Sequence, residues 1–147
     1  RILDLQFTLD TTWDGLNLET EKEFCAFNFE EADIELHFKL FGEFEREAER
    51  LLEKNLVGPG YDYVIKCSHA FNMLEARGAI SVTERTGYIG RVRRLARLAA
   101  QAYLRQRERL GYPLVQDAEL RGKLVAEAAA RREAREAKGG KAKGGAR

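Results

Sequence analysis

The chain has 147 residues, of which 44% are apolar and 33% are charged, and its formal net charge is +1. This length and composition are typical of one globular domain with a heavily charged surface, and no apolar run is long enough to insert into a membrane. The charges are divided unevenly, because residues 1–60 hold 15 acidic and 6 basic side chains and residues 61–147 hold 9 and 19. The two halves can attract each other within the domain, or the second half can present a positive face to RNA or an acidic partner.

The two cysteines, Cys25 and Cys67, do not form a CxxC motif, and with only two histidines the chain is a poor source of zinc ligands. We therefore expect two buried, reduced thiols in an intracellular protein, with a single disulfide as the alternative. The first residue is Arg1, and no signal-peptide pattern follows it. We expect a chain that is processed, trimmed or part of a longer protein.

Residues 1–26 have the least regular pattern. The segment ILDLQF, residues 2–7, alternates apolar and polar side chains over most of its length and predicts a short strand. TTWDG, residues 11–15, predicts a turn, and the polar NLETEKE of residues 17–23 predicts a loop. Because a strand without a neighbour is unusual in a complete domain, we interpret residues 1–26 as a strand and loop remnant of a preceding domain.

Three amphipathic helices are expected between residues 27 and 114. The first begins with Asn28 as its N-cap and ends near Asn55 and the following VGPG. The second spans about residues 61–77 and is closed by Gly78, and the third spans residues 82–110 and is closed by Gly111. The apolar side chains that recur at helical spacing, and that we expect to face the core, are Ile34, Phe38, Phe41, Phe44, Ala48, Leu51 and Leu52, then Tyr61, Val64, Ile65, Phe71 and Leu74, then Tyr88, Ile89, Val92, Leu95, Ala96, Ala99, Ala102 and Tyr103.

The tail after residue 114 changes in composition. It is rich in Ala, Arg and Glu, with a thin apolar stripe of Leu120, Leu124 and Ala128, and it ends in the basic GGKAKGGAR. Such a segment forms a marginal helix that needs a partner, followed by a flexible end. The predicted fold class is therefore mainly α: a three-helix bundle-like domain over residues 27–114, a strand and loop remnant before it, and a charged helical tail or linker over residues 115–147.

Polar side chains gather at the corner between the second and third predicted helices. They are His69, Asn72, Glu75, Arg77, Ser81, Glu84 and Arg85. The chain has no nucleophile elbow, phosphate-binding Gly-rich loop or HExxH motif, so no catalytic residue and no metal ligand is assigned. Ser81 and Glu84 fit a capping box, and a network of Glu75, Arg77, Glu84 and Arg85 could fix the turn. A structural role for this corner is favoured over a catalytic one.

The third helix carries an arginine-rich outer face. Arg91, Arg94, Arg97, Arg105 and Arg109 are its candidates for contact with RNA or with an acidic protein. The alternative is that the acidic first helix, with Glu43, Glu45, Glu47 and Glu49, neutralises this face within the domain. The sequence weighs the two interpretations about equally.

Three segments together resemble one known family. They are HAFNMLEARGAISVTERTGYIGRVRRLARLAAQAYLRQRERLGYPL from His69, FNFEEADIELHFKLFGEFEREAERLL from Phe27 and YDYVIKCSHAFN from Tyr61. They resemble the C-terminal helical region of the alpha chain of bacterial-type, heterotetrameric glycyl-tRNA synthetase, a class II aminoacyl-tRNA synthetase. The likeness is close from about Phe27 to Leu114. Residues 1–26 resemble the family more loosely, and the tail after Val115 resembles nothing familiar.

The resemblance implies a supporting part of a glycine–tRNA ligase. The family's catalytic sheet would lie before Arg1, so no catalytic residue is carried over, and ATP and Mg²⁺ are expected for the parent enzyme but not in this stretch. The implied partners are the catalytic domain, the beta chain or other protein subunits, and tRNA, in the bacterial cytoplasm, a plastid or a mitochondrion. Two alternatives remain open: a repurposed structural or assembly subunit of a larger complex, and an RNA-binding helical module. Whether the protein is itself an enzyme also remains open.

Overall fold

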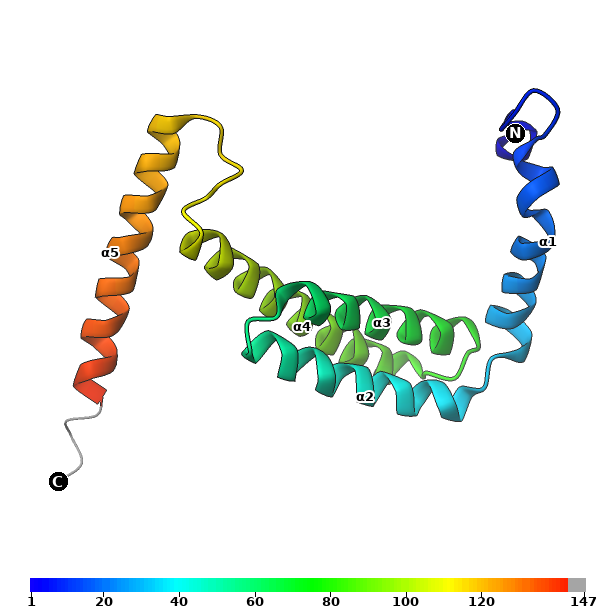
Figure 1. The fold of residues 1–147 in the computed structure, drawn as a ribbon. Helices are drawn as coiled ribbons and strands as arrows, with labels where there is room; N and C mark the ends of the chain where they lie inside the picture. Colours follow the sequence, from blue (N-terminus) through cyan, green and yellow to red (C-terminus); the bar gives the residue numbers. More distant parts are fainter. Residues whose placement is uncertain (143–147) are drawn as a thin grey trace.

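The computed structural model describes residues 1–142, and within them the chain is a succession of helices (Figure 1). Their order is the 3₁₀ helix η1 (Ile2–Asp4), α1 (Trp13–Ala26), the π-helical turn η2 (Phe27–Glu31), α2 (Ile34–Glu53), α3 (Val57–Ala76), α4 (Val82–Arg109) and α5 (Ala118–Ala142). The mainly α fold class is confirmed. Helices α2, α3 and α4 pack side by side as a three-helix bundle, and α1 and α5 extend from its opposite ends (Figure 1). The end of the expected flexible tail, residues 143–147, lies outside the described residues.

The bundle core forms where the three helices meet. Its fully buried large side chains are Phe41, Cys67, Leu74 and Leu95, one or two from each helix. Tyr88 of α4 joins the helices through its ring, which meets Phe41 edge-on at a centroid distance of 4.9 Å and stacks with Phe71 at 6.2 Å. Burial of these apolar surfaces is the main stabilising contribution to the bundle.

Close approach between α2 and α3 depends on one glycine. A Cβ placed on Gly60 would lie 2.7 Å from Cδ2 of Leu52, which is closer than real Cβ contacts. The first long helix ends before Asn55 as expected, but the second was expected to begin at about Tyr61, and α3 begins earlier, at Val57, so residues 57–60 form its first turn. Pro59 fits there because backbone N–H groups in a first helical turn have no intrahelical acceptor. The chain reverses just before it, at Asn55, with φ of 58°.

The predicted strand and loop at the N-terminus are also wrong. Residues 2–4 form η1, closed by an ion pair between the Arg1 amino group and Asp4 at 3.1 Å, and the only extended pairing within residues 1–142 is an isolated bridge between Gln6 and Thr12. Because no second strand is present there to complete a ladder, a strand at residues 2–7 has no partner for its backbone groups.

The expected turn and loop at residues 11–23 form the first part of α1 instead. The Thr12 hydroxyl accepts a hydrogen bond from the Gly15 N–H at 3.3 Å, and Asp14 lies in the first turn, where the helix dipole favours a negative charge. Asn28 does not cap a helix, because α1 continues through η2. Asp33 is the N-cap of α2, with its carboxylate 2.9 Å from the Leu36 nitrogen.

The ends of α3 and α4 agree with the sequence. Gly78 and Gly111 adopt left-handed φ values of 65° and 71° just after α3 and α4, which is the conformation expected of helix-ending glycines. Both cysteines are free thiols. Cys67 is buried as expected, whereas the expectation is wrong for Cys25, which is exposed on α1 because that segment is a helix with no buried residue.

Candidate partner-binding surfaces

The polar corner divides into two separate sets of contacts. At the start of α4, the Ser81 hydroxyl accepts from the Glu84 N–H at 3.2 Å, and the Glu84 carboxylate accepts from the Ser81 N–H at 3.0 Å, so the expected capping box is present. The hydrogen bond from the Ser81 hydroxyl lowers the pKa of Glu84 below its ordinary value. Separately, Glu75 of α3 forms an ion pair with Arg85 of α4, which ties the two helices across the turn.

Arg77 belongs to a different junction from the one expected. Its guanidinium donates to the backbone carbonyl of Ala32 at 3.3 Å and so ties the end of α3 to the segment before α2. His69 and Asn72 are exposed one turn apart on α3, and they border a shallow hollow of about 190 Å³ that also involves Asn28. The Ser81 hydroxyl and the Glu84 carboxylate, 2.6 Å apart, are a hydroxyl–carboxylate pair at this corner, and both groups are engaged in the cap of α4. The contacts there are therefore those of a structural junction.

Two of the five candidate arginines pair with the acidic helix α2. Glu45, whose side chain is 13% exposed, accepts hydrogen bonds from Arg91, with Nε at 3.1 Å, and from Arg94, with Nη2 at 3.1 Å. Arg94 also forms an ion pair with Glu49. The hydrogen bond from Arg91 is the main cause that holds the pKa of Glu45 below its ordinary value. The guanidinium of Arg91 lies over the ring of Phe41 at 4.5 Å, so this network packs directly on the core.

The other three candidates, Arg97, Arg105 and Arg109, are exposed, and no ion pair joins them to another described side chain. The candidate face thus consists of two arginines used within the bundle and three that are open to solvent. Internal neutralisation by α2 accounts for Arg91 and Arg94 and leaves the role of the other three as a prediction.

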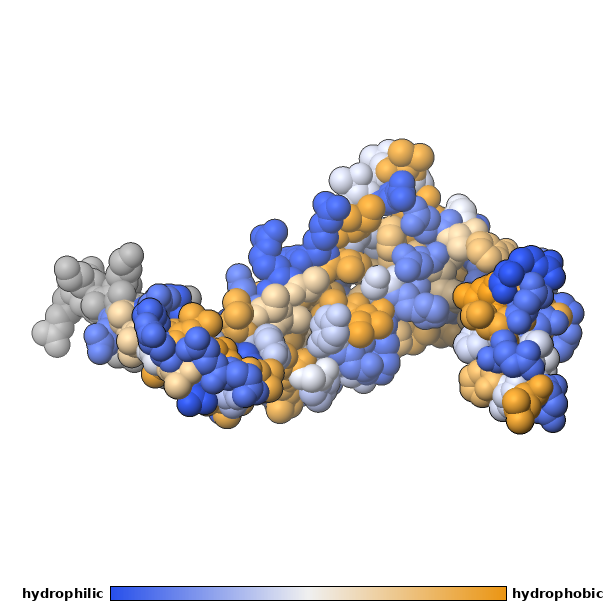
Figure 2. Space-filling model, turned by 90° about the horizontal axis from the view of Figure 1, so that it is seen from above, coloured by the Kyte–Doolittle hydropathy of each residue, from blue (hydrophilic) through white to orange (hydrophobic). Residues whose placement is uncertain are grey.

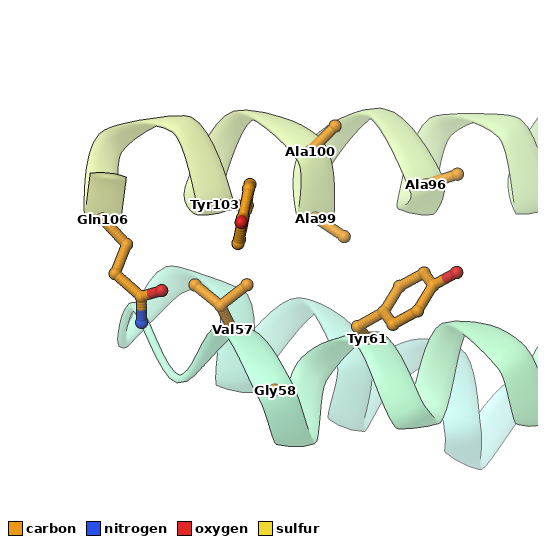
Figure 3. Close-up of a pocket in the computed structure, with 8 residues that line it drawn as sticks. All are labelled: Val57, Gly58, Tyr61, Ala96, Ala99, Ala100, Tyr103 and Gln106. Atoms are coloured by element: carbon orange, nitrogen blue, oxygen red, sulfur yellow. The ribbon is translucent and has the colours of Figure 1, made fainter. Parts of the chain in front are cut away.

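An apolar groove between α3 and α4 did not appear in the sequence-based prediction. It has a volume of about 590 Å³ and is lined by Val57, Gly58, Tyr61, Ala96, Ala99, Ala100, Tyr103 and Gln106 (Figure 3). Tyr61 rises from α3 toward α4, and Tyr103 descends from α4 toward α3, so the two rings lie at different points along the groove (Figure 3). We expected Tyr61, Ile65, Ala96 and Tyr103 to be core residues, but all four are exposed because no further helix of the described chain covers this side.

A second apolar surface lies on α1. Trp13, Leu16 and Phe24 of α1, and Phe27 at the start of η2, recur on one side and are between 36% and 59% exposed. Orange apolar atoms accordingly reach the surface of this N-terminal arm in the space-filling view (Figure 2). Aromatic and leucine side chains grouped in this way are typical of surfaces that contact other proteins.

Within residues 1–142, no helix is both long enough and apolar enough to cross a membrane. Among the side chains that the structure describes, no group of three His, Cys, Asp or Glu residues is arranged to hold a metal ion.

Taken together, the fold and its surfaces define a helical module with one apolar arm and one apolar groove on a rigid bundle. A model of the family described as glycyl-tRNA synthetase alpha subunit matches residues 1–108. This match covers well over half of the chain, so the chain belongs to that family. The match confirms the resemblance drawn from residues 27–114, and it also includes the N-terminal segment. It supports a role in a glycine–tRNA ligase alpha chain. Helix α5 lies beyond the matched residues.

Proposed function

We propose that this chain acts as the C-terminal helical, non-catalytic part of a glycine–tRNA ligase alpha chain. In this role it supports ATP-dependent glycylation of tRNA(Gly) by packing on the catalytic domain and by contacting the beta chain. The proposal assigns residues 1–26 to the junction with the catalytic domain, residues 27–114 to the helical domain and residues 115–147 to a tail or linker. Because tRNA is aminoacylated inside cells, the proposed location is intracellular, in the bacterial cytoplasm, a plastid or a mitochondrion.

The observation that carries the proposal is the apolar arm. Helix α1 has no buried residue, although it carries Trp13, Leu16 and Phe24 on one side. Phe27 of η2 meets the ring of His37 of α2, but the bundle buries no residue of α1, so removing the apolar side of α1 from water requires another protein surface. A junction with a catalytic domain supplies such a surface. ATP and Mg²⁺ belong to the reaction of that domain, and no side chain described here is assigned to them.

The test compares two matched variants of the full-length alpha chain, each combined with the beta chain. Phe24→Ser removes an aromatic side chain from the apolar side of α1, whereas Lys22→Ser changes an exposed residue about 160° around the same helix. Formation of glycyl-tRNA(Gly) with ATP and glycine is measured, and circular dichroism checks that helix content is kept. We expect Phe24→Ser to lower kcat/KM by about tenfold or more and Lys22→Ser to leave it nearly unchanged.

Two other outcomes would favour the alternatives. If the native complex that contains this chain forms no glycyl-tRNA but holds the chain stably, the chain is a structural or assembly subunit. If the chain instead binds RNA by itself, and binding weakens steeply with salt and on replacement of Arg97, Arg105 and Arg109, it is an RNA-binding module.

A further inference from the structure

We propose that the groove between α3 and α4 is the docking site for one amphipathic helix with acidic flanks, supplied by the beta chain. This inference rests on the proposed function, because it names the surface through which that partner is held. The groove runs from Ala96 to Gln106 along α4, which corresponds to about 15 Å, or three turns, of helix. A docked helix of roughly eleven residues would therefore convert the three-helix bundle into a four-helix bundle.

The side chains of the groove have the pattern of a helix interface. Val57, Tyr61 and Ile65 recur every four residues along α3, and Tyr61 and Ile65 are 53% and 52% exposed. On α4 the floor is made of alanines, which allow a neighbouring helix backbone to approach closely. This is the arrangement of core positions in a bundle, although Tyr61, Ile65, Ala96 and Ala100 are exposed here. The helical spacing of these residues is typical of a core, but several of them are exposed. This combination is expected when the helix that covers them comes from another chain.

Charged side chains along the groove indicate which kind of helix would bind there. Arg93 and Arg97 each precede a groove alanine by three residues, so they lie along the outer wall of the groove on α4. Arg107 lies at its end, where the guanidinium stacks on Tyr103 at 5.0 Å while its Nε is buried without a hydrogen-bond partner. No ion pair joins these three arginines to another described side chain. A helix with Asp or Glu beside its apolar stripe would complement them.

Helix α5 of the same chain is not the occupant. Arg131 of α5 donates to Glu108 at 3.1 Å and forms an ion pair with it, and Ala128 of α5 is buried. Glu108 does not line the groove, and it is turned about 140° around α4 from Tyr103 and about 160° from Gln106, the groove residues at its level. The described contacts of α5 with α4 thus lie outside the groove, which stays open for a separate chain.

The experiment measures binding of the full-length alpha chain to the purified beta chain by titration calorimetry. Ala100→Arg places a long charged side chain in the groove, and Gln101→Arg places the same side chain at the next exposed position, outside it. We expect Ala100→Arg to weaken binding by about tenfold or more and Gln101→Arg to change it less than about threefold. A double change, Arg93→Glu with Arg97→Glu, should weaken binding and reduce its salt dependence, whereas Arg105→Glu on the opposite side of α4 should not.

Failure of this inference is distinguishable from failure of the proposed function. If the unmodified chain binds the beta chain and Ala100→Arg binds equally well, the groove is not the docking site, and the proposed function stands. If the unmodified chain does not bind the beta chain, the proposed partnership fails and this inference fails with it. If Ala100→Arg abolishes self-association in sedimentation experiments instead, the occupant is a second copy of this chain, and the assignment to the beta chain is overturned.

Discussion

Replacing Phe41 with alanine tests whether the bundle core is placed correctly. Phe41 is 1% exposed, its ring meets Tyr88 edge-on at 4.9 Å, and Arg91 lies over its face at 4.5 Å. A buried Phe→Ala substitution costs about 3–5 kcal/mol through lost transfer energy and the cavity left behind. Because Tyr88 and Arg91 are held by other contacts, they cannot fill the space fully, so we expect about 4 kcal/mol, near the middle of that range.

Phe38 provides the matched control on the same helix. Its side chain is 36% exposed, and its ring lies 6.3 Å from Tyr88, so Phe38→Ala should cost only about 1 kcal/mol. Urea unfolding at neutral pH, followed by circular dichroism, gives both values and shows from the slope whether the transition remains cooperative. A loss for Phe41→Ala no greater than that for Phe38→Ala would refute this description of the core.

Three further predictions follow from the polar contacts and the thiols. Glu45→Gln should lower stability at pH 7 by roughly 1–2 kcal/mol, because Glu45 accepts charged hydrogen bonds from Arg91 and Arg94 whose own side chains are partly exposed. The folded pKa of Glu45 lies below its ordinary value of 4.5, so this stability is present above pH 4.5 and is lost as the pH falls through the folded pKa. Urea unfolding of the unmodified protein and of Glu45→Gln at several pH values should show that the difference between their free energies of unfolding becomes smaller at acidic pH. Ser81→Ala should cost about 0.5–2 kcal/mol through loss of the helix cap, and Ser81→Thr should restore most of it in thermal melts. Burial raises the pKa of Cys67 to about 12, so a thiol reagent at pH 8 should label only Cys25 in the folded protein, and Cys25→Ser should abolish the fast reaction.

The parts of the fold that were predictable from the sequence depend on local chemistry. Ser81 and Glu84 form a capping box wherever they precede a helix, and Gly78 and Gly111 end helices because left-handed backbone is accessible to glycine. The core position of Phe41 follows from helical spacing in a strongly amphipathic segment. These signals act over a few residues and do not depend on what surrounds the helix.

The parts that were not predictable depend on competition between signals or on neighbours. The Asp14–Gly15 pair is typical of a turn, but the Thr12 cap places it in the first turn of α1, where both residues are tolerated. Helical spacing also assigned Tyr61 and Tyr103 to the core, because periodicity identifies an apolar side of a helix but not whether the same chain covers it. The groove was missed for this reason, whereas the α1 surface was missed because residues 11–23 were predicted as a turn and a loop rather than a helix.

The distribution of arginines on α4 connects the fold to the proposed contacts. Successive residues turn by about 100° around a helix, so arginines two positions apart, such as Arg91 and Arg93, face different neighbours, whereas Arg91 and Arg94, three apart, share one. Arg91 and Arg94 point to α2 and are neutralised by Glu45 and Glu49. Arg93 and Arg97 fall on the side next to the groove and have no acidic partner among the described side chains. The excess of basic residues in the second half of the sequence thus has two roles on one helix. Arg91 and Arg94 join α4 to α2, and Arg93 and Arg97 form a positively charged edge beside an uncovered apolar surface. This arrangement favours a partner that carries carboxylates.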